Sequence, residues 1–79
     1  MNKLEHSNDI FAAQPGETLM VCDPVVVLNM RVPGTIKYQC GEKLRVAEVR
    51  QHLVWCFDQQ GRSVALDRED TLCVERSKT

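Results

Sequence analysis

The sequence is poor in aromatic residues and has almost no net charge. Phe, Trp and Tyr make up 5% of its 79 residues, and ten Lys and Arg residues stand against eleven Asp and Glu residues. A near-neutral chain has neither the positive field of a strongly basic nucleic-acid-binding module nor the negative field of an acidic tail. The chain also has no long apolar run and no basic segment followed by an apolar one near its start. We therefore expect no transmembrane span, no secretory signal and a cytoplasmic location.

What is present is an ordinary globular composition. Hydrophobic residues account for 43% of the chain and charged residues for 27%, which distinguishes it from a disordered segment. A chain of this length forms one small domain with a thin core.

The cysteines show no close pairing. None of the four lies in a C-x-x-C pair, and three of them occur in apolar, strand-like runs: Cys22, Cys56 and Cys73. We expect reduced and mostly buried thiols, with no metal and no cofactor, because structural zinc sites usually draw ligands from close-spaced pairs. The less favoured alternatives are a two-disulfide scaffold and a site built from four separate thiolates.

The chain divides into an arm, a β domain and a tail. Residues 1–17 form a polar N-terminal arm that ends at a Pro-Gly turn signal and has room for one helical turn around Ile10 and Phe11. The arm either frays or docks these two side chains on the domain or on a partner. Residues 18–76 alternate between apolar and polar positions in short runs separated by turns, and residues 77–79 are a polar tail.

Short strands joined by tight turns, with no long helix, predict an all-β fold. We expect a small closed or half-closed barrel of five to six strands, with residues 35–39 either a strand or an irregular arm. We also expect Trp55 in the core, a single 3₁₀ turn at residues 68–70, and Leu72 and Val74 pointing inward from the last strand.

The final third of the chain resembles the closing half of SH3-like barrels of bacterial or phage type. It has a Gly-Glu-Lys-Leu strand from Gly41, an aromatic strand at Trp55, a hairpin at Gly61, a one-turn link and a last strand ending near Val74. The resemblance implies an SH3-like barrel, with an OB-like barrel as the runner-up. Peptide-binding SH3 domains use a row of aromatic residues, which this chain lacks, so we do not expect it to bind Pro-x-x-Pro segments.

The sequence offers no constellation for catalysis, and we expect no enzyme. His6 lies in the arm, and His52 is about 13 Å from Cys56 if residues 53–57 form a strand, which is too far for proton transfer. The acidic residues around Arg68 lack the spacing of a calcium-binding loop.

A protein-binding role has an apolar run in its favour. Residues 25–28 are apolar on both faces, and residues 24 and 33 are prolines, so we expect an edge strand with either Val26 and Leu28 or Val25 and Val27 facing outward. An exposed aliphatic face requires a cover, which is the arm, a second copy or another protein. We therefore predict a small binding module, regulator or inhibitor. Its candidate contact residues are Val25, Val26, Val27, Leu28, Ile10 and Phe11.

Weak nucleic-acid binding by a regulatory protein is the alternative. Its basis is a set of basic and aromatic residues in the middle of the chain, although Glu42, Glu48 and Asp58 are interleaved with them. The candidate residues are Lys37, Tyr38, Lys43, Arg45, Arg50 and Arg62.

Overall fold

The computed structural model describes residues 9–76, which form seven strands and two short 3₁₀ helices. The elements, in chain order, are η2 (Ile10–Ala12), β1 (Thr18–Val21), β2 (Val25–Asn29), β3 (Thr35–Tyr38), β4 (Lys43–Val49), β5 (Val54–Asp58), β6 (Ser63–Leu66), η3 (Arg68–Leu72) and β7 (Val74–Arg76).

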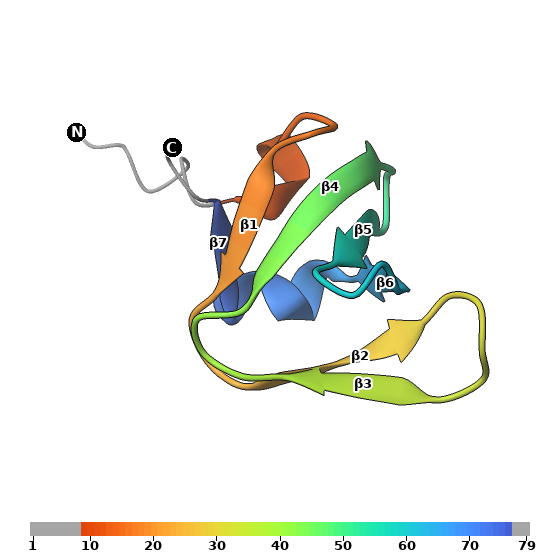
Figure 1. The fold of residues 1–79 in the computed structure, drawn as a ribbon. Helices are drawn as coiled ribbons and strands as arrows, with labels where there is room; N and C mark the ends of the chain where they lie inside the picture. Colours follow the sequence, from red (N-terminus) through yellow and green to blue (C-terminus); the bar gives the residue numbers. More distant parts are fainter. Residues whose placement is uncertain (1–8, 77–79) are drawn as a thin grey trace.

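All seven strands belong to one antiparallel sheet in the order β3-β2-β6-β5-β4-β1-β7. The sheet curls into a half-barrel, with the β2–β3 hairpin at one end and β1 and β7 at the other (Figure 1). The prediction of an all-β, barrel-like fold is confirmed. There is one more strand than the expected maximum, because residues 35–38 pair with residues 25–28 of β2 and form a strand of their own.

The core lies on the concave side of the sheet, where the alternating apolar positions meet. β5 buries Val54 and Cys56, and the facing β6 residues Leu66 and Val64 are buried with them. This follows from strand geometry, since residues two apart share a face. A register shift between Val46 and Glu48 in β4 marks a bulge, an irregularity that bends a strand and so helps the sheet to curl.

The described part of the arm docks on the domain. Asp9 caps η2 by accepting a hydrogen bond from the backbone N–H of Phe11 at 2.9 Å, and Ile10 is completely buried. Phe11 packs against the core, and its ring lies 4.0 Å from the guanidinium carbon of Arg68. The core therefore begins before Thr18. The remaining arm residues, 1–8, and the tail, 77–79, lie outside the described residues.

Three sequence-based expectations are wrong in detail. Leu72 is 83% exposed, because the capping box between Asp67 and Asp70 starts a 3₁₀ helix that continues through Leu72. Trp55 is half-buried on the outer face, since the inward positions of β5 belong to its neighbours. β2 is not an edge strand: it lies between β3 and β6, and β3 is the edge.

Candidate functional site

The apolar run of β2 presents one side to the core and the other to solvent. Val25 and Val27 are buried, whereas Val26 is 55% exposed and Leu28 is 63% exposed. The structure thus decides between the two pairs predicted from the sequence, and places Val26 and Leu28 on the outside.

The exposed apolar side chains continue into the tip of the β2–β3 hairpin. Met30 is 44% exposed and Val32 is 61% exposed. The side chain of Asn29 holds the tip in shape by accepting hydrogen bonds from the backbone N–H groups of Arg31 (2.9 Å) and Val32 (3.2 Å). Among residues 9–76, four of the six exposed large hydrophobic residues lie on this hairpin. We call these four the hairpin surface: Val26, Leu28, Met30 and Val32.

The hairpin surface has a one-sided charge. Between Pro24 and Gly41 the sequence contains no Asp or Glu, and its charged residues are Arg31 and Lys37. Both are exposed, and within residues 9–76 neither forms a salt bridge. Lys37 is the cross-strand partner of Val26, so the two side chains share the outer face.

The inner side of the hairpin is fastened to the β5–β6 turn. Tyr38 is buried, and its hydroxyl donates a 2.7 Å hydrogen bond to Oδ2 of Asp58. Arg62 donates to the same oxygen through Nε, also at 2.7 Å. Tyr38 therefore has no free ring face for base stacking, and Arg62 serves a carboxylate of its own chain.

The environment of Asp58 keeps it ionised. Burial opposes the charged form, but hydrogen bonds from Arg62, Tyr38 and the backbone of Gln60 outweigh it and hold the pKa of Asp58 below its ordinary value. Burial, followed by the hydrogen bond to Asp58, raises the pKa of Tyr38. The Tyr38 hydroxyl is thus a permanent donor in this cluster.

The other basic residues do not form one face. Arg50 is paired with Glu48 at 2.9 Å. Lys43 and Arg45 project from β4, which three strands of the sheet separate from Lys37 on β3. Of the six predicted nucleic-acid contacts, only Lys43 and Arg45 lie close together on the surface. Within residues 9–76 neither of these two side chains forms a salt bridge.

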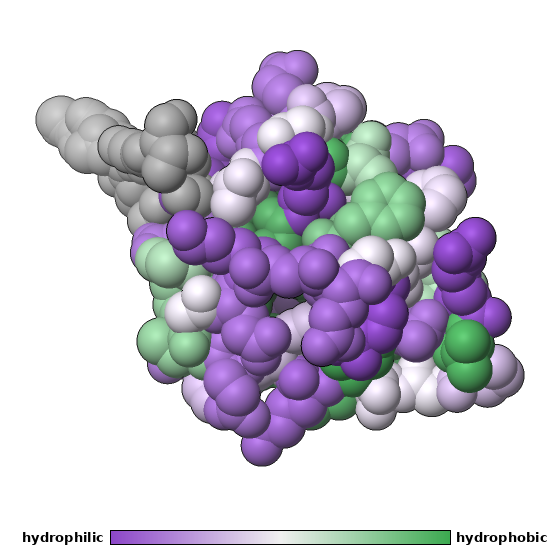
Figure 2. All heavy atoms as spheres, in the orientation of Figure 1, coloured by the Kyte–Doolittle hydropathy of each residue, from purple (hydrophilic) through white to green (hydrophobic). Residues whose placement is uncertain are grey.

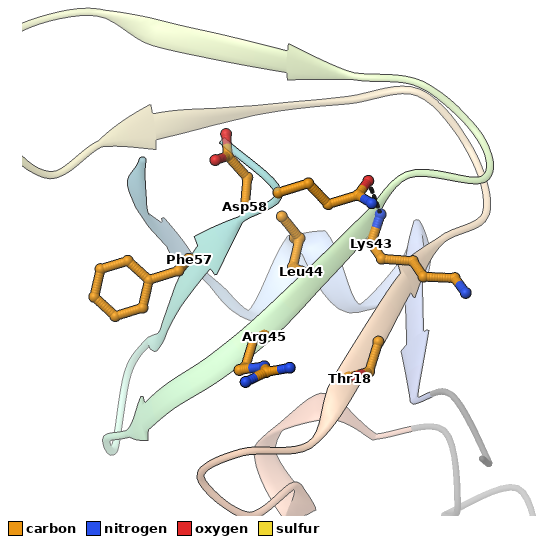
Figure 3. Close-up of a pocket in the computed structure, with 7 residues that line it drawn as sticks. Thr18, Lys43, Leu44, Arg45, Phe57 and Asp58 are labelled. Atoms are coloured by element: carbon orange, nitrogen blue, oxygen red, sulfur yellow. Dashed lines mark hydrogen bonds between the residues drawn. The ribbon is translucent and has the colours of Figure 1, made fainter. Parts of the chain in front are cut away.

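Lys43 and Arg45 border a shallow hollow of about 400 Å³. It spans β4, with Thr18 of β1 on one side and Phe57 of β5 on the other (Figure 3). Phe57 is 38% exposed and faces Arg45 across the strands. Phe57 is not among the contact residues predicted from the sequence. Its position two residues after Trp55 nevertheless places the two side chains on the same face of β5. The two rings lie 6.3 Å apart.

The four thiols differ in their exposure. Cys56 is fully buried, and burial raises its pKa to about 12. Cys22 and Cys73 are only half-buried and Cys40 is exposed, so fewer thiols are buried than the apolar runs around Cys22, Cys56 and Cys73 predicted. In the described range 9–76, no group of three or more His, Cys, Asp and Glu residues is placed to hold a metal ion.

Comparisons with known proteins add no relative. No protein-family model, no curated protein and no solved structure matches the chain. None of the helices within residues 9–76 is long and apolar enough to cross a membrane. On the face seen in Figure 2, apolar atoms form separate patches among polar ones, and some reach the surface at the end where the hairpin lies.

Proposed function

We propose that this chain is a small, non-enzymatic, cytoplasmic protein-binding module, a regulator or inhibitor, that acts through the hairpin surface. The observation that carries the proposal is the gathering of four exposed apolar side chains on one hairpin, held by a turn that keeps them outward. Burying one such side chain fully on a partner stabilises a complex by roughly 1.5–3 kcal/mol. Two or three of them are enough to anchor an interface of modest size.

We further propose that the half-barrel belongs to the SH3-like class. Its support is the run of antiparallel neighbours β7-β1-β4-β5-β6 and the 3₁₀ helix η3 placed directly before the last strand. The class fixes no activity, so the functional proposal rests on the hairpin alone.

The test is a matched pair of surface variants. Val26→Lys/Leu28→Lys changes the hairpin surface, and Leu72→Lys changes an exposed leucine on η3. Each tagged full-length protein is incubated with native cell extract, with and without nuclease, and is also sedimented alone. We expect the double variant to lose the captured protein while Leu72→Lys retains it, with the same thermal unfolding curve for all three. If the double variant captures the same protein as the parent, the hairpin surface is not the interface.

A second candidate function, binding of single-stranded nucleic acid, has the Lys43–Arg45 hollow in its favour. Cations beside an exposed aromatic ring suit a phosphate backbone and a stacked base. Its test is the retention of a labelled single-stranded oligonucleotide at low and high salt. If the hollow binds the oligonucleotide, Lys43→Glu/Arg45→Glu and Phe57→Ala each weaken retention, and Val26→Lys/Leu28→Lys does not.

A further inference from the structure

We propose that the partner of the hairpin surface is a different protein that presents an apolar patch bordered by Asp or Glu side chains. This inference rests on the proposed function and adds the chemistry of the partner.

Two cations flank the apolar residues of the hairpin surface. Lys37 lies beside Val26 at the base of the hairpin, and Arg31 lies between Met30 and Val32 at its tip. The apolar strip therefore carries one positive charge near each end. Within residues 9–76 neither charge has a salt-bridge partner, although three other arginines of the chain are paired with carboxylates. A partner carboxylate near each end matches this pattern.

A two-fold dimer of this chain through the same surface fits the charges less well. In such a dimer the identical patch of each copy faces the other. The segment from Pro24 to Gly41 contains no carboxylate, so the hairpin of each copy would bring its Arg31 and Lys37 against a hairpin that carries only positive charge. The nearby Asp58 is already engaged by Tyr38 and Arg62, and Glu42 accepts the backbone N–H of Gln39 at 2.8 Å. Asp23, the exposed carboxylate next to this segment, is one acid for two cations, so a different partner that supplies the acids fits the charges better.

A protein partner fits the hairpin surface better than a nucleic acid does. Affinity for a phosphate backbone grows with the number of cations that contact it. The hairpin offers two cations among four large apolar side chains, and its one aromatic residue, Tyr38, is buried. A phosphate chain has no apolar surface with which to cover Val26 and Leu28. Such a composition fits a protein surface in which aliphatic contacts give affinity and carboxylates give orientation and rate of encounter.

The experiment selects peptides on the full-length protein from a phage-displayed random library, and then measures the binding of each enriched peptide to four proteins. These are the parent, Val26→Lys/Leu28→Lys, the charge reversal Arg31→Glu/Lys37→Glu, and the matched reversal Lys43→Glu/Arg45→Glu on β4. The single variant Arg31→Glu, at the exposed tip, supplies a second readout in case the double reversal disturbs β3.

We expect enriched peptides that combine aliphatic residues with Asp or Glu. Their binding should be lost with the hairpin double variant and weakened on the order of tenfold by the reversal at Arg31 and Lys37, since close interfacial charge pairs contribute on this scale. The reversal on β4 should leave it unchanged. Replacing the acids of the peptide by Lys should restore binding to the Arg31→Glu/Lys37→Glu protein.

The contrary outcomes are distinct. Peptides that lose binding to Val26→Lys/Leu28→Lys but not to Arg31→Glu/Lys37→Glu overturn the inference and leave the proposed function standing. Peptides that bind the hairpin double variant as well as the parent overturn the proposed function. If the parent protein sediments as a dimer and Val26→Lys/Leu28→Lys sediments as a monomer, the partner of the hairpin surface is a second copy of this chain. If the parent retains an oligonucleotide and Arg31→Glu/Lys37→Glu does not, the partner of the hairpin surface is a nucleic acid. Either of these last two results overturns the inference.

Discussion

Two hairpins of the sheet, β5–β6 and β2–β3, use their side chains in opposite ways. At the β5–β6 turn, Asp58 accepts hydrogen bonds from the backbone N–H groups of Gln60 (2.9 Å) and Arg62 (2.8 Å), and from the side chains of Tyr38 and Arg62. The polar groups of this turn thus meet one another's hydrogen-bonding needs. At the β2–β3 hairpin a single side chain, Asn29, supports the tip, and the outer positions carry exposed apolar residues.

The difference supports the proposal that the β5–β6 hairpin serves the fold and the β2–β3 hairpin serves a partner. Hydrogen bonds directed inward, as at Asp58, stabilise the domain and offer little to a ligand. Apolar side chains directed outward, as at Leu28, contribute little to the stability of the isolated domain, and a contiguous set of them marks a surface suited to a partner. Substitutions in the two hairpins can test this division between a hairpin for the fold and a hairpin for a partner.

The largest effect should come from Asp58→Ala. The change leaves the buried hydroxyl of Tyr38 and the guanidinium of Arg62 without their acceptor and releases the turn. We expect a loss of roughly 3 kcal/mol in the free energy of unfolding, measured in urea. The control is Asp67→Ala, which removes the cap of η3 and should cost about 1 kcal/mol. Equal losses for the two variants would show that the Asp58 cluster has no special weight.

Neighbouring positions of β2 should respond very differently to the same change. Val27→Ala removes two methyl groups from the core and should cost about 2 kcal/mol, whereas Val26→Ala should change stability by less than about 0.5 kcal/mol. Thermal unfolding of both variants gives the comparison. A cost for Val26→Ala as large as that for Val27→Ala would mean that part of the chain covers the hairpin surface.

The pH dependence of stability should follow Asp58. Its pKa is lower in the folded state than the value of about 3.9 expected when unfolded. The stabilisation from the ionised carboxylate is therefore present above that value, and is lost as the pH falls through the folded pKa. Asp58→Asn should flatten the acid limb of a stability–pH curve more than Glu17→Gln, whose carboxylate pairs with Arg76 at the half-exposed edge of the sheet. The reverse order would contradict the assignment.

Asn29→Ala should have a small effect on stability and a larger one on binding. Only two backbone hydrogen bonds at the tip depend on this side chain, so we expect a loss of about 1 kcal/mol or less. Partner binding should weaken severalfold all the same, because Met30 and Val32 lose their fixed positions. A titration of the captured partner measures this, and unchanged affinity would show that the tip lies outside the interface.

Periodicity in the sequence was enough to predict the all-β fold and the alternation along β2. It could not reveal the Asp58 cluster, because Tyr38 and Asp58 are 20 residues apart and nothing local marks them as partners. Met30 and Val32 were missed for a related reason: beyond the last residue of β2, alternation no longer says which side faces solvent. Leu72 was misplaced because the capping residues that extend η3 compete with the strand pattern around Val74.

The most direct test of the central claim is hydroxyl-radical footprinting of the protein, free and bound to its captured partner. The hairpin surface contains readily oxidised side chains at Leu28 and Met30, and Leu72, which is 83% exposed, is the reference on η3. We expect oxidation of Leu28 and Met30 to fall severalfold in the complex while Leu72 is unchanged. Protection of Leu72 or Phe57 with Met30 still fully oxidised would contradict the proposal that the β2–β3 hairpin is the binding surface.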